Sequence, residues 1–118
     1  MSKTILLVDD DPAIVESTTL LLEFAGFQVK SAQDGFAIKK HMIGSVPDLI
    51  LLDYWLPKKN GREIIKELKN NYKTKAIPIL VISASHNIRE LIHEAGADGF
   101  LEKPFDFDVL VSTMEKYL

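Results

Sequence analysis

Acidic, hydroxyl and basic side chains stand just after four short apolar runs of the sequence. They are Asp9, Asp10 and Asp11 after the first run, Asp53 after the third, Ser83 after the fourth and Lys103 after the fifth. Carboxylates that lie close together repel one another, and they either raise one another's pKa or bind a cation. Mg2+ prefers oxygen ligands, so Asp9, Asp10 and Asp53 form a candidate magnesium site. The chain has no Cys, which argues against Zn2+.

The same side chains suit the chemistry of phosphoryl transfer. A carboxylate such as that of Asp53 can act as a nucleophile toward phosphorus and form an acyl phosphate. Transfer then needs compensation of the charge on the phosphoryl oxygens. Mg2+, the Lys103 ammonium and the Ser83 hydroxyl would each contact one of these oxygens. Asp11 is interpreted differently, as the N-cap of a helix that begins at Pro12.

Strand and helix signals alternate along the chain and must position these residues. The apolar runs predict strands at Ile5–Val8, Phe27–Ser31, Leu49–Leu52, Ile79–Ile82 and Gly99–Leu101. Helices are predicted from Asp11 to Gly26 and over Gly35–Met42, Arg62–Asn70, Asn87–Ala95 and Phe107–Tyr117. Such alternation is typical of an α/β doubly wound sheet, in which ligands bind outside the carboxyl ends of parallel strands. The polar residues are therefore expected to meet at one edge.

Two of the predicted helices have clear apolar faces. Ile14, Leu21 and Leu22 are expected to form the inner face of the first helix. In the third helix, Ile64 and Leu68 are expected to point inward together with Ile65.

Length and composition narrow the class of protein. The chain has 118 residues, which fits one domain. Its net charge of −3 argues against a nucleic-acid-binding surface, because phosphate neutralisation needs clustered positive charge. There is no apolar run near the ~20 residues of a membrane span and no signal peptide, and the absence of Cys suits the cytosol. A cytoplasmic protein with no direct contact to nucleic acid or membrane is expected.

Four segments together resemble the receiver domains of two-component response regulators. They are ILLVDDDP at 5–12, PDLILLDYWLPKKNG at 47–61, PILVISAS at 78–85 and EAGADGFLEKPF at 94–105. The resemblance covers essentially the whole chain and implies one receiver domain over residues 1–118. It also implies a flavodoxin-like (βα)5 sandwich with a five-stranded parallel sheet in the order 2-1-3-4-5.

The resemblance implies a role for each acid. Asp53 would accept a phosphoryl group from a histidine kinase or a phosphotransfer protein. Asp9, Asp10 and Asp53, with the backbone carbonyl of Trp55, would hold Mg2+. The chain would catalyse only its own phosphotransfer and autodephosphorylation, so it would not be a conventional enzyme.

The remaining implied roles concern the switch. Lys103 and Ser83 would contact the phosphoryl group, and the Lys103–Pro104 peptide bond would be cis. Ser83 would move toward the phosphate while Phe100 turns inward. This would change the surface of the fourth helix, the last strand and the fifth helix, which would control an output partner or domain and could support phosphorylation-dependent dimerisation.

Three alternatives stay open at this point. An aspartate-nucleophile phosphatase would need a general acid two residues after the nucleophile, where this chain has Trp55. A pseudo-receiver would have the fold without phosphorylation, although it usually lacks an acid or the Lys. The chain could also be the receiver part of a larger protein. Trp55 itself would either shield the acyl phosphate from water or cover an apolar patch.

Overall fold

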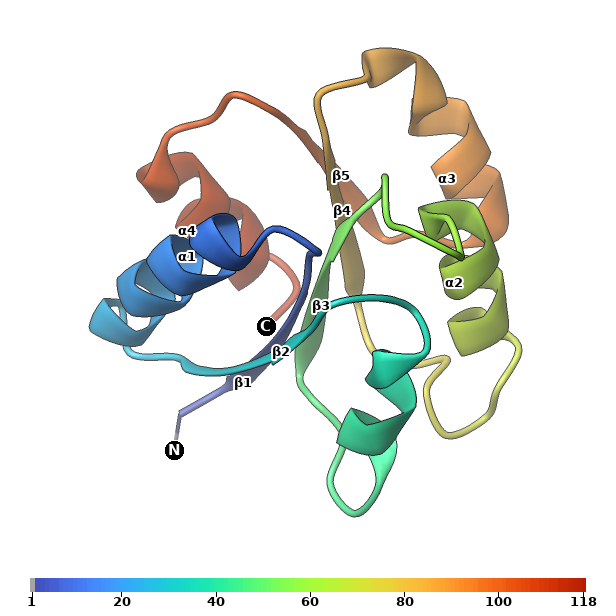
Figure 1. Cartoon of the computed structure of the whole chain (residues 1–118), viewed down its shortest axis with the longest axis horizontal. Helices are drawn as coiled ribbons and strands as arrows, with labels where there is room; N and C mark the ends of the chain where they lie inside the picture. Colours follow the sequence, from blue (N-terminus) through green and yellow to red (C-terminus); the bar gives the residue numbers. More distant parts are fainter. Residues whose placement is uncertain (1) are drawn as a thin grey trace.

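A computed structural model describes residues 2–118 of the chain, except for the side chain of residue 86 (Figure 1). Within these residues, one sheet is formed by β1 (Thr4–Val8), β2 (Gln28–Ala32), β3 (Leu49–Asp53), β4 (Ile79–Ser83) and β5 (Gly99–Glu102). All neighbouring strands are parallel, and their order is β2-β1-β3-β4-β5. This confirms the predicted flavodoxin-like α/β fold and its sheet order.

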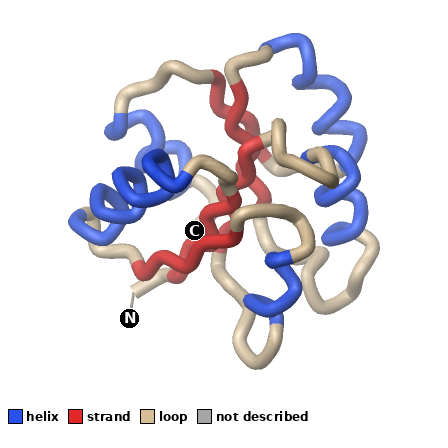
Figure 2. The backbone as a smooth tube through the Cα atoms, viewed as in Figure 1, coloured by secondary structure: helices blue, strands red, loops and turns tan. Residues whose placement is uncertain are grey.

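Helices cover both faces of the sheet. In the described part of the chain they are α1 (Pro12–Phe24), the 3-10 helix η1 (Ala37–Met42), α2 (Gly61–Lys69), the 3-10 helix η2 (His86–Ile88), α3 (Arg89–Ala95) and α4 (Phe107–Glu115). Figure 2 shows α1 and α4 on one side of the strands, and η1, α2 and α3 on the other. No helix among these residues is long and apolar enough to cross a bilayer.

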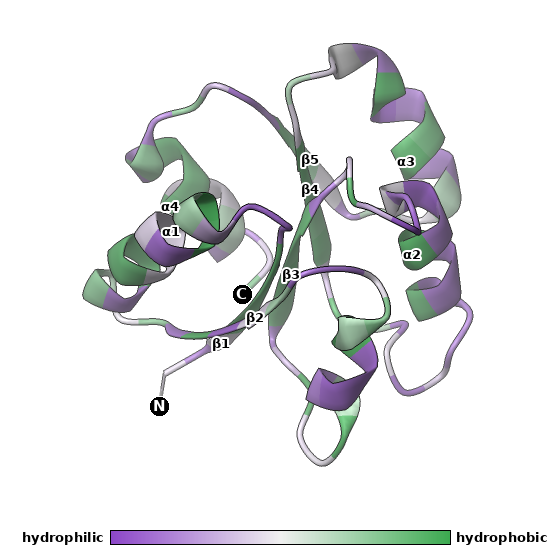
Figure 3. Cartoon of the chain, viewed as in Figure 1, coloured by the Kyte–Doolittle hydropathy of each residue, from purple (hydrophilic) through white to green (hydrophobic). Residues whose placement is uncertain are grey.

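The sheet separates two apolar cores. Successive side chains of a strand point to opposite faces. Leu6 and Ile50 therefore join the core beneath α2 and α3, whereas Ile5 and Leu51 join the core beneath α1 and α4. β4 is buried at all five positions, as the sequence predicts for a strand covered on both faces. β4 is accordingly green in the hydropathy view of Figure 3.

The second and fourth helical segments differ from the prediction. The second forms a short 3-10 helix in place of a helix over Gly35–Met42, although Asp34 does accept a hydrogen bond from the Ala37 amide at 2.9 Å. The fourth begins with a 3-10 turn, so its α-helix starts only at Arg89. Such turns are common where helices begin, and apolar periodicity alone does not distinguish them.

The predicted inner face of α1 is partly wrong. Leu22 is fully buried as expected, but Ile14 is 38% exposed and Leu21 is 47% exposed. Val15 packs on the same core as Leu22, and these two residues are seven positions apart on one helical face. The buried stripe is therefore displaced by one residue from the predicted one. Ile14 and Leu21 instead line a cavity of about 230 Å³ that α1 shares with Phe107 of α4.

The inner face of α2 agrees with the prediction, and its start is capped. Ile64, Ile65 and Leu68 are all buried. Asn60, which has the sequence signature of a turn, is the N-cap of α2 and accepts a hydrogen bond from the Glu63 amide at 3.0 Å.

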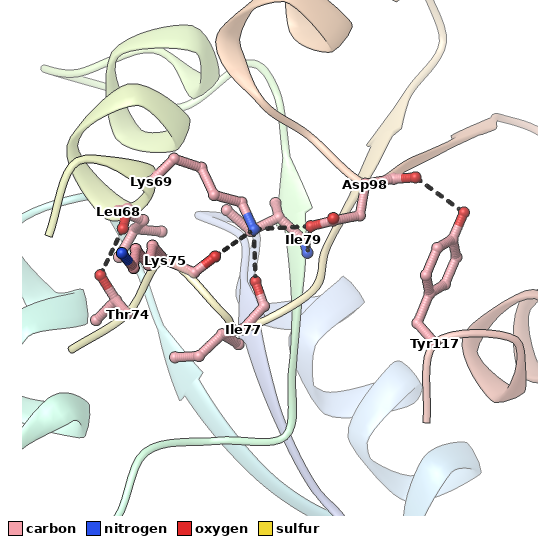
Figure 4. A network of polar contacts seen from close by, with 8 residues as sticks. All are labelled: Leu68, Lys69, Thr74, Lys75, Ile77, Ile79, Asp98 and Tyr117. Carbon is pink, nitrogen blue, oxygen red and sulfur yellow. Dashed lines mark hydrogen bonds and ion pairs between the residues drawn. The ribbon is translucent and has the colours of Figure 1, made fainter. Parts of the chain in front are cut away.

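A polar cluster joins segments at the amino-terminal end of the sheet (Figure 4). Lys69 Nζ donates to the Lys75 carbonyl at 3.1 Å, to the Ile77 carbonyl at 2.9 Å and to Asp98 Oδ2 at 2.9 Å. The same oxygen of Asp98 accepts from the Ile79 amide at 2.8 Å. The end of α2 is thus tied to the starts of β4 and β5, far along the chain.

The glycine at the start of α2 is required by a close backbone approach. Gly61 donates from its amide to the Tyr54 carbonyl at 2.9 Å. A Cβ added to Gly61 would lie 2.8 Å from Tyr54 Cδ1 and 3.0 Å from Tyr54 Cα. This contact holds α2 against the loop that follows Asp53.

We predict that Gly61→Ala destabilises the fold. An alanine in a helix ordinarily stabilises by ~0.5–1 kcal/mol relative to glycine. Here the clash with Tyr54 should reverse the sign and cost about 1–3 kcal/mol of the free energy of unfolding. Urea denaturation measures the change, and exposed Arg62→Ala should stay within about 0.5 kcal/mol of the parent. A more stable Gly61→Ala protein would show that the close approach does not exist.

Candidate functional site

The strand register brings the polar residues to one edge of the sheet. Val8 of β1 pairs with Leu52 of β3, so the residues that follow them, Asp9 and Asp53, lie side by side. Asp53 in turn pairs with Ile82, one residue before Ser83. The predicted meeting of these residues at the carboxyl ends of the strands therefore follows from the pairing.

Three carboxylates form a compact acidic cluster. Asp9, Asp10 and Asp53 each offer an oxygen, and these atoms lie within 4.8 Å of one another. Asp9 is buried, Asp53 is half-buried and Asp10 is exposed. The cluster is thus open to solvent on one side and fixed to the protein on the other.

Backbone amides orient the acids. Asp9 Oδ1 accepts from the Asp11 amide at 3.0 Å, and Asp53 Oδ1 lies 3.4 Å from the Trp55 amide that donates to it. Asp11 behaves as the predicted N-cap, because its Oδ1 accepts from the Ala13 amide at 3.0 Å. The Asp11 side chain therefore serves as the cap of α1.

The electrostatics of the site favour protonation or a cation. Burial raises the pKa of both Asp9 and Asp53, and the charge of Lys103 opposes this increase at each carboxyl. Repulsion from Asp9 and Asp10 raises the pKa of Asp53 further. A positive partner would therefore stabilise the ionised forms of these two carboxyls.

Lys103 and Ser83 border the acidic cluster from the neighbouring strands. Lys103 lines the cavity of about 230 Å³ together with Asp9 and Asp53. Its amide donates to the Ser83 carbonyl at 2.9 Å, and its peptide bond to Pro104 is cis, as the resemblance implies. Ser83 is buried, and its Oγ accepts from the Ser85 amide at 3.0 Å. The hydroxyl is held by its own loop in this structure.

Two further residues of the sequence analysis lie outside the cluster. Phe100 is half-buried on β5, with the Arg89 guanidinium 4.9 Å from the centre of its ring. The Trp55 side chain is 58% exposed and packs edge-on against buried Tyr54, with ring centres 4.8 Å apart.

The apolar wall of the site was not predicted. Ile14, Thr18 and Leu21 of α1 face Phe105 and Phe107 across the cavity that contains Lys103. The sequence signal was present, because Ile14 and Leu21 belong to the apolar stripe of the first helix. It was interpreted as core.

The fold and the site together define a class of protein. The chain belongs to the response regulator receiver domain family, whose model matches residues 5–115. Receiver domains of this family act in phosphorylation-based two-component signalling, and the resemblance inferred from four segments is thereby confirmed.

Individual relatives are consistent with this assignment. The chain is 37% identical over 116 residues to the DNA-binding dual master transcriptional regulator RpaA of Synechocystis, covering 97% of this chain and 48% of that protein. The chain spans about half the length of the curated relatives it matches.

Two solved structures show the same fold. The phosphorylated cyanobacterial phytochrome response regulator RcpA has a TM-score of 0.82 at 28% identity, with 98% of this chain and 91% of that chain covered. The receiver domain of the sensor histidine kinase PA1611 of Pseudomonas aeruginosa, solved with magnesium coordinated in its active-site cleft, has a TM-score of 0.89 at 26% identity. It covers 99% of this chain and 98% of that chain.

The raised pKa values predict how stability depends on pH in metal-free buffer. The folded state binds protons at Asp9 and Asp53 more tightly than the unfolded chain, whose carboxyls titrate near 3.8. The contribution of these two carboxyls to the free energy of unfolding is therefore complete below pH 3.8. It is lost as pH rises through their higher pKa values in the folded state. At pH 7, Asp53→Asn should raise Tm by about 2–5 °C, and it should flatten the fall in Tm as pH rises above 3.8.

Thermal unfolding followed by circular dichroism measures both effects. Glu16→Gln removes an exposed acid of α1 and should leave Tm unchanged. A lower Tm for Asp53→Asn would mean that the cluster carries no electrostatic strain.

Proposed function

We propose that Asp53 is the phosphoacceptor of this receiver domain and takes its phosphoryl group from a histidine kinase or a phosphotransfer protein. The observation that carries the proposal is the grouping of the Asp9, Asp10 and Asp53 oxygens within 4.8 Å, beside Lys103. Asp53 ends β3, the strand at the centre of the sheet, and is half-buried.

The residues of the cluster fit a bound Mg2+. The donors are carboxylate oxygens, one member is exposed to solvent, and their mutual repulsion favours a divalent cation. Asp9, Asp10 and Asp53, with the backbone carbonyl of Trp55, would hold the ion. When bound, Mg2+ would offset the negative charge of the acids and of the incoming phosphoryl group.

The transfer itself uses groups of the chain. An oxygen of Asp53 forms the new bond to phosphorus while the bond from phosphorus to the donor nitrogen breaks, and the electron pair stays with the imidazole. The Lys103 ammonium compensates charge on the phosphoryl oxygens. Water later cleaves the acyl phosphate, which is the autodephosphorylation step, so the domain is a switch with a limited lifetime.

The switch would begin at Ser83. A phosphoryl oxygen offers its hydroxyl an acceptor, whereas in the structure Ser83 Oγ accepts from the Ser85 amide. Movement of this loop and of Phe100 would change the surface of α3, β5 and α4 that an output partner or domain contacts. A change from ~1% to ~99% active needs a preference of about 5.5 kcal/mol for the active state. Phosphorylation-dependent dimerisation through this surface stays a prediction, as do the single domain over 1–118, the cytoplasmic location and the lack of direct contact to nucleic acid.

Intact mass after treatment with acetyl phosphate tests the phosphoacceptor. With Mg2+, the parent protein should gain about 80 Da, and Asp53→Asn should gain nothing. Asp11→Asn is the matched control, because Asp11 is a helix cap and should not change the gain. EDTA should prevent the gain in every variant. A parent protein that gains no mass would favour the pseudo-receiver alternative, and an Asp53→Asn protein that gains 80 Da would move the acceptor elsewhere.

The two roles left open for Trp55 predict different lifetimes of the phosphoryl group. If the indole shields the acyl phosphate, Trp55→Ala should shorten its half-life without changing the amount formed, whereas Trp55→Phe should retain most of the protection. If the indole only packs on Tyr54, the half-life should stay the same and only the stability should fall. The decay of the 80 Da gain with time gives the half-life.

A further inference from the structure

A second concave site lies between η1 and α2, away from the acidic cluster. We call it the η1–α2 groove, lined mainly by Ile38, Lys39, Met42, Ile64, Leu68 and Lys73. Its volume is about 320 Å³, at the lower end of the range for ligand sites. η1 and α2 lie side by side on the same face of the sheet in Figure 1. The short 3-10 helix η1 forms one wall of the groove, and α2 with the loop that follows it forms the other.

The floor of the groove is apolar. Ile38, Ile64 and Leu68 are buried members of the core beneath α2. Beside this floor, Ile43 is 80% exposed, and Tyr72 in the following loop is 83% exposed. An apolar side chain from outside could extend the core into the groove and remove further apolar surface from water.

The rim of the groove is positive. Lys39 on one wall and Lys73 on the other form no ion pair within the described residues. The acid on the wall, Glu67, is already neutralised, because its Oε1 lies 2.7 Å from Lys59 Nζ. Two cations without a partner therefore face each other across an apolar floor.

The segment that contains the groove is positively charged, like the rim. Residues 39–75 hold nine of the 14 Lys and Arg residues but four of the 17 Asp and Glu residues, a net charge of +5 in a chain of −3. Such an asymmetry favours association with an acidic partner.

From the apolar floor and the positive rim, we propose that the η1–α2 groove is a docking site for an acidic segment of a partner protein that inserts a large apolar side chain. The concave shape favours this partner over an anionic bilayer, because a flat surface cannot fill the groove. The apolar floor favours it over nucleic acid, whose phosphates would find no partner there. The site lies on the other face of the sheet from α1 and α4.

A defined peptide tests the docking site on the unphosphorylated chain. The probe is fluorescein-labelled acetyl-Glu-Glu-Leu-Phe-Glu-Glu-amide, with binding followed by fluorescence anisotropy and its position mapped by amide shifts in nuclear magnetic resonance. Binding should move the amides of Lys39, Ile43 and Asn71 in particular. A peptide with Ala in place of Leu and Phe, and a peptide with Lys in place of every Glu, should both bind at least about tenfold more weakly.

Charge-reversal variants locate the interaction. The double variant Lys39→Glu and Lys73→Glu should weaken binding about tenfold, because two favourable contacts become repulsive. The matched double variant Lys3→Glu and Lys30→Glu changes the net charge equally outside the groove and should weaken binding less than about twofold. All four lysines are exposed, so circular dichroism should show both variants folded.

Three outcomes would overturn the proposal. The first is no binding of the probe, and the second is amide shifts confined to α1, α4 or the acidic cluster. The third is equal loss of affinity in both double variants, which would indicate attraction by net charge alone. Phosphatidylglycerol vesicles serve as the alternative ligand. If the amides of the η1–α2 groove shift with vesicles but not with the peptide, the groove binds a membrane surface instead.

Discussion

Repulsion among the Asp9, Asp10 and Asp53 carboxylates is the constraint on which the rest of the structure depends. Three acids with oxygens within 4.8 Å of one another do not assemble spontaneously. They are forced together by the pairing of β1 with β3, and this pairing is stabilised by two apolar cores that have no contact with solvent at residues such as Leu6 and Leu51. The free energy of the cores thus offsets the strain of the site. The acids are thus already grouped before any positive partner binds, which lowers the ordering cost of binding.

The two proposed sites lie on different faces of the sheet. The face under α1 and α4 borders the cavity with Lys103, where the phosphoryl chemistry is proposed. The face under α2 and α3 contains Phe100 and the η1–α2 groove. β4 and β5 are shared by both faces, and Val81, two residues before Ser83, is paired with Phe100 on the adjacent strand.

The sequence predicted those parts of the molecule that depend on local signals. Strands such as Ile79–Ile82 are apolar throughout, and Asp11 followed by Pro12 marks a helix start by its own chemistry, so both were found. The inner face of α1 was partly wrong because Ile14, Val15, Leu21 and Leu22 are all apolar, and only the packing partner decides which of them is buried. The shortened second helix was not predicted, because apolar periodicity does not distinguish a 3-10 helix from an α-helix. The Lys69–Asp98 contact joins residues 29 positions apart, beyond the reach of any local pattern.

That same contact joins β4 and β5 at the amino-terminal end of the sheet. Asp98 binds the Ile79 amide and Lys69 together, so β4 and β5 start from one shared anchor. At their other ends, Ser83 is the last residue of β4, and Lys103 and Pro104 follow β5. A side-chain ion pair therefore ties the two strands together at their amino-terminal ends, whereas at their carboxyl ends the strands are joined by the backbone hydrogen bond from the Lys103 amide to the Ser83 carbonyl.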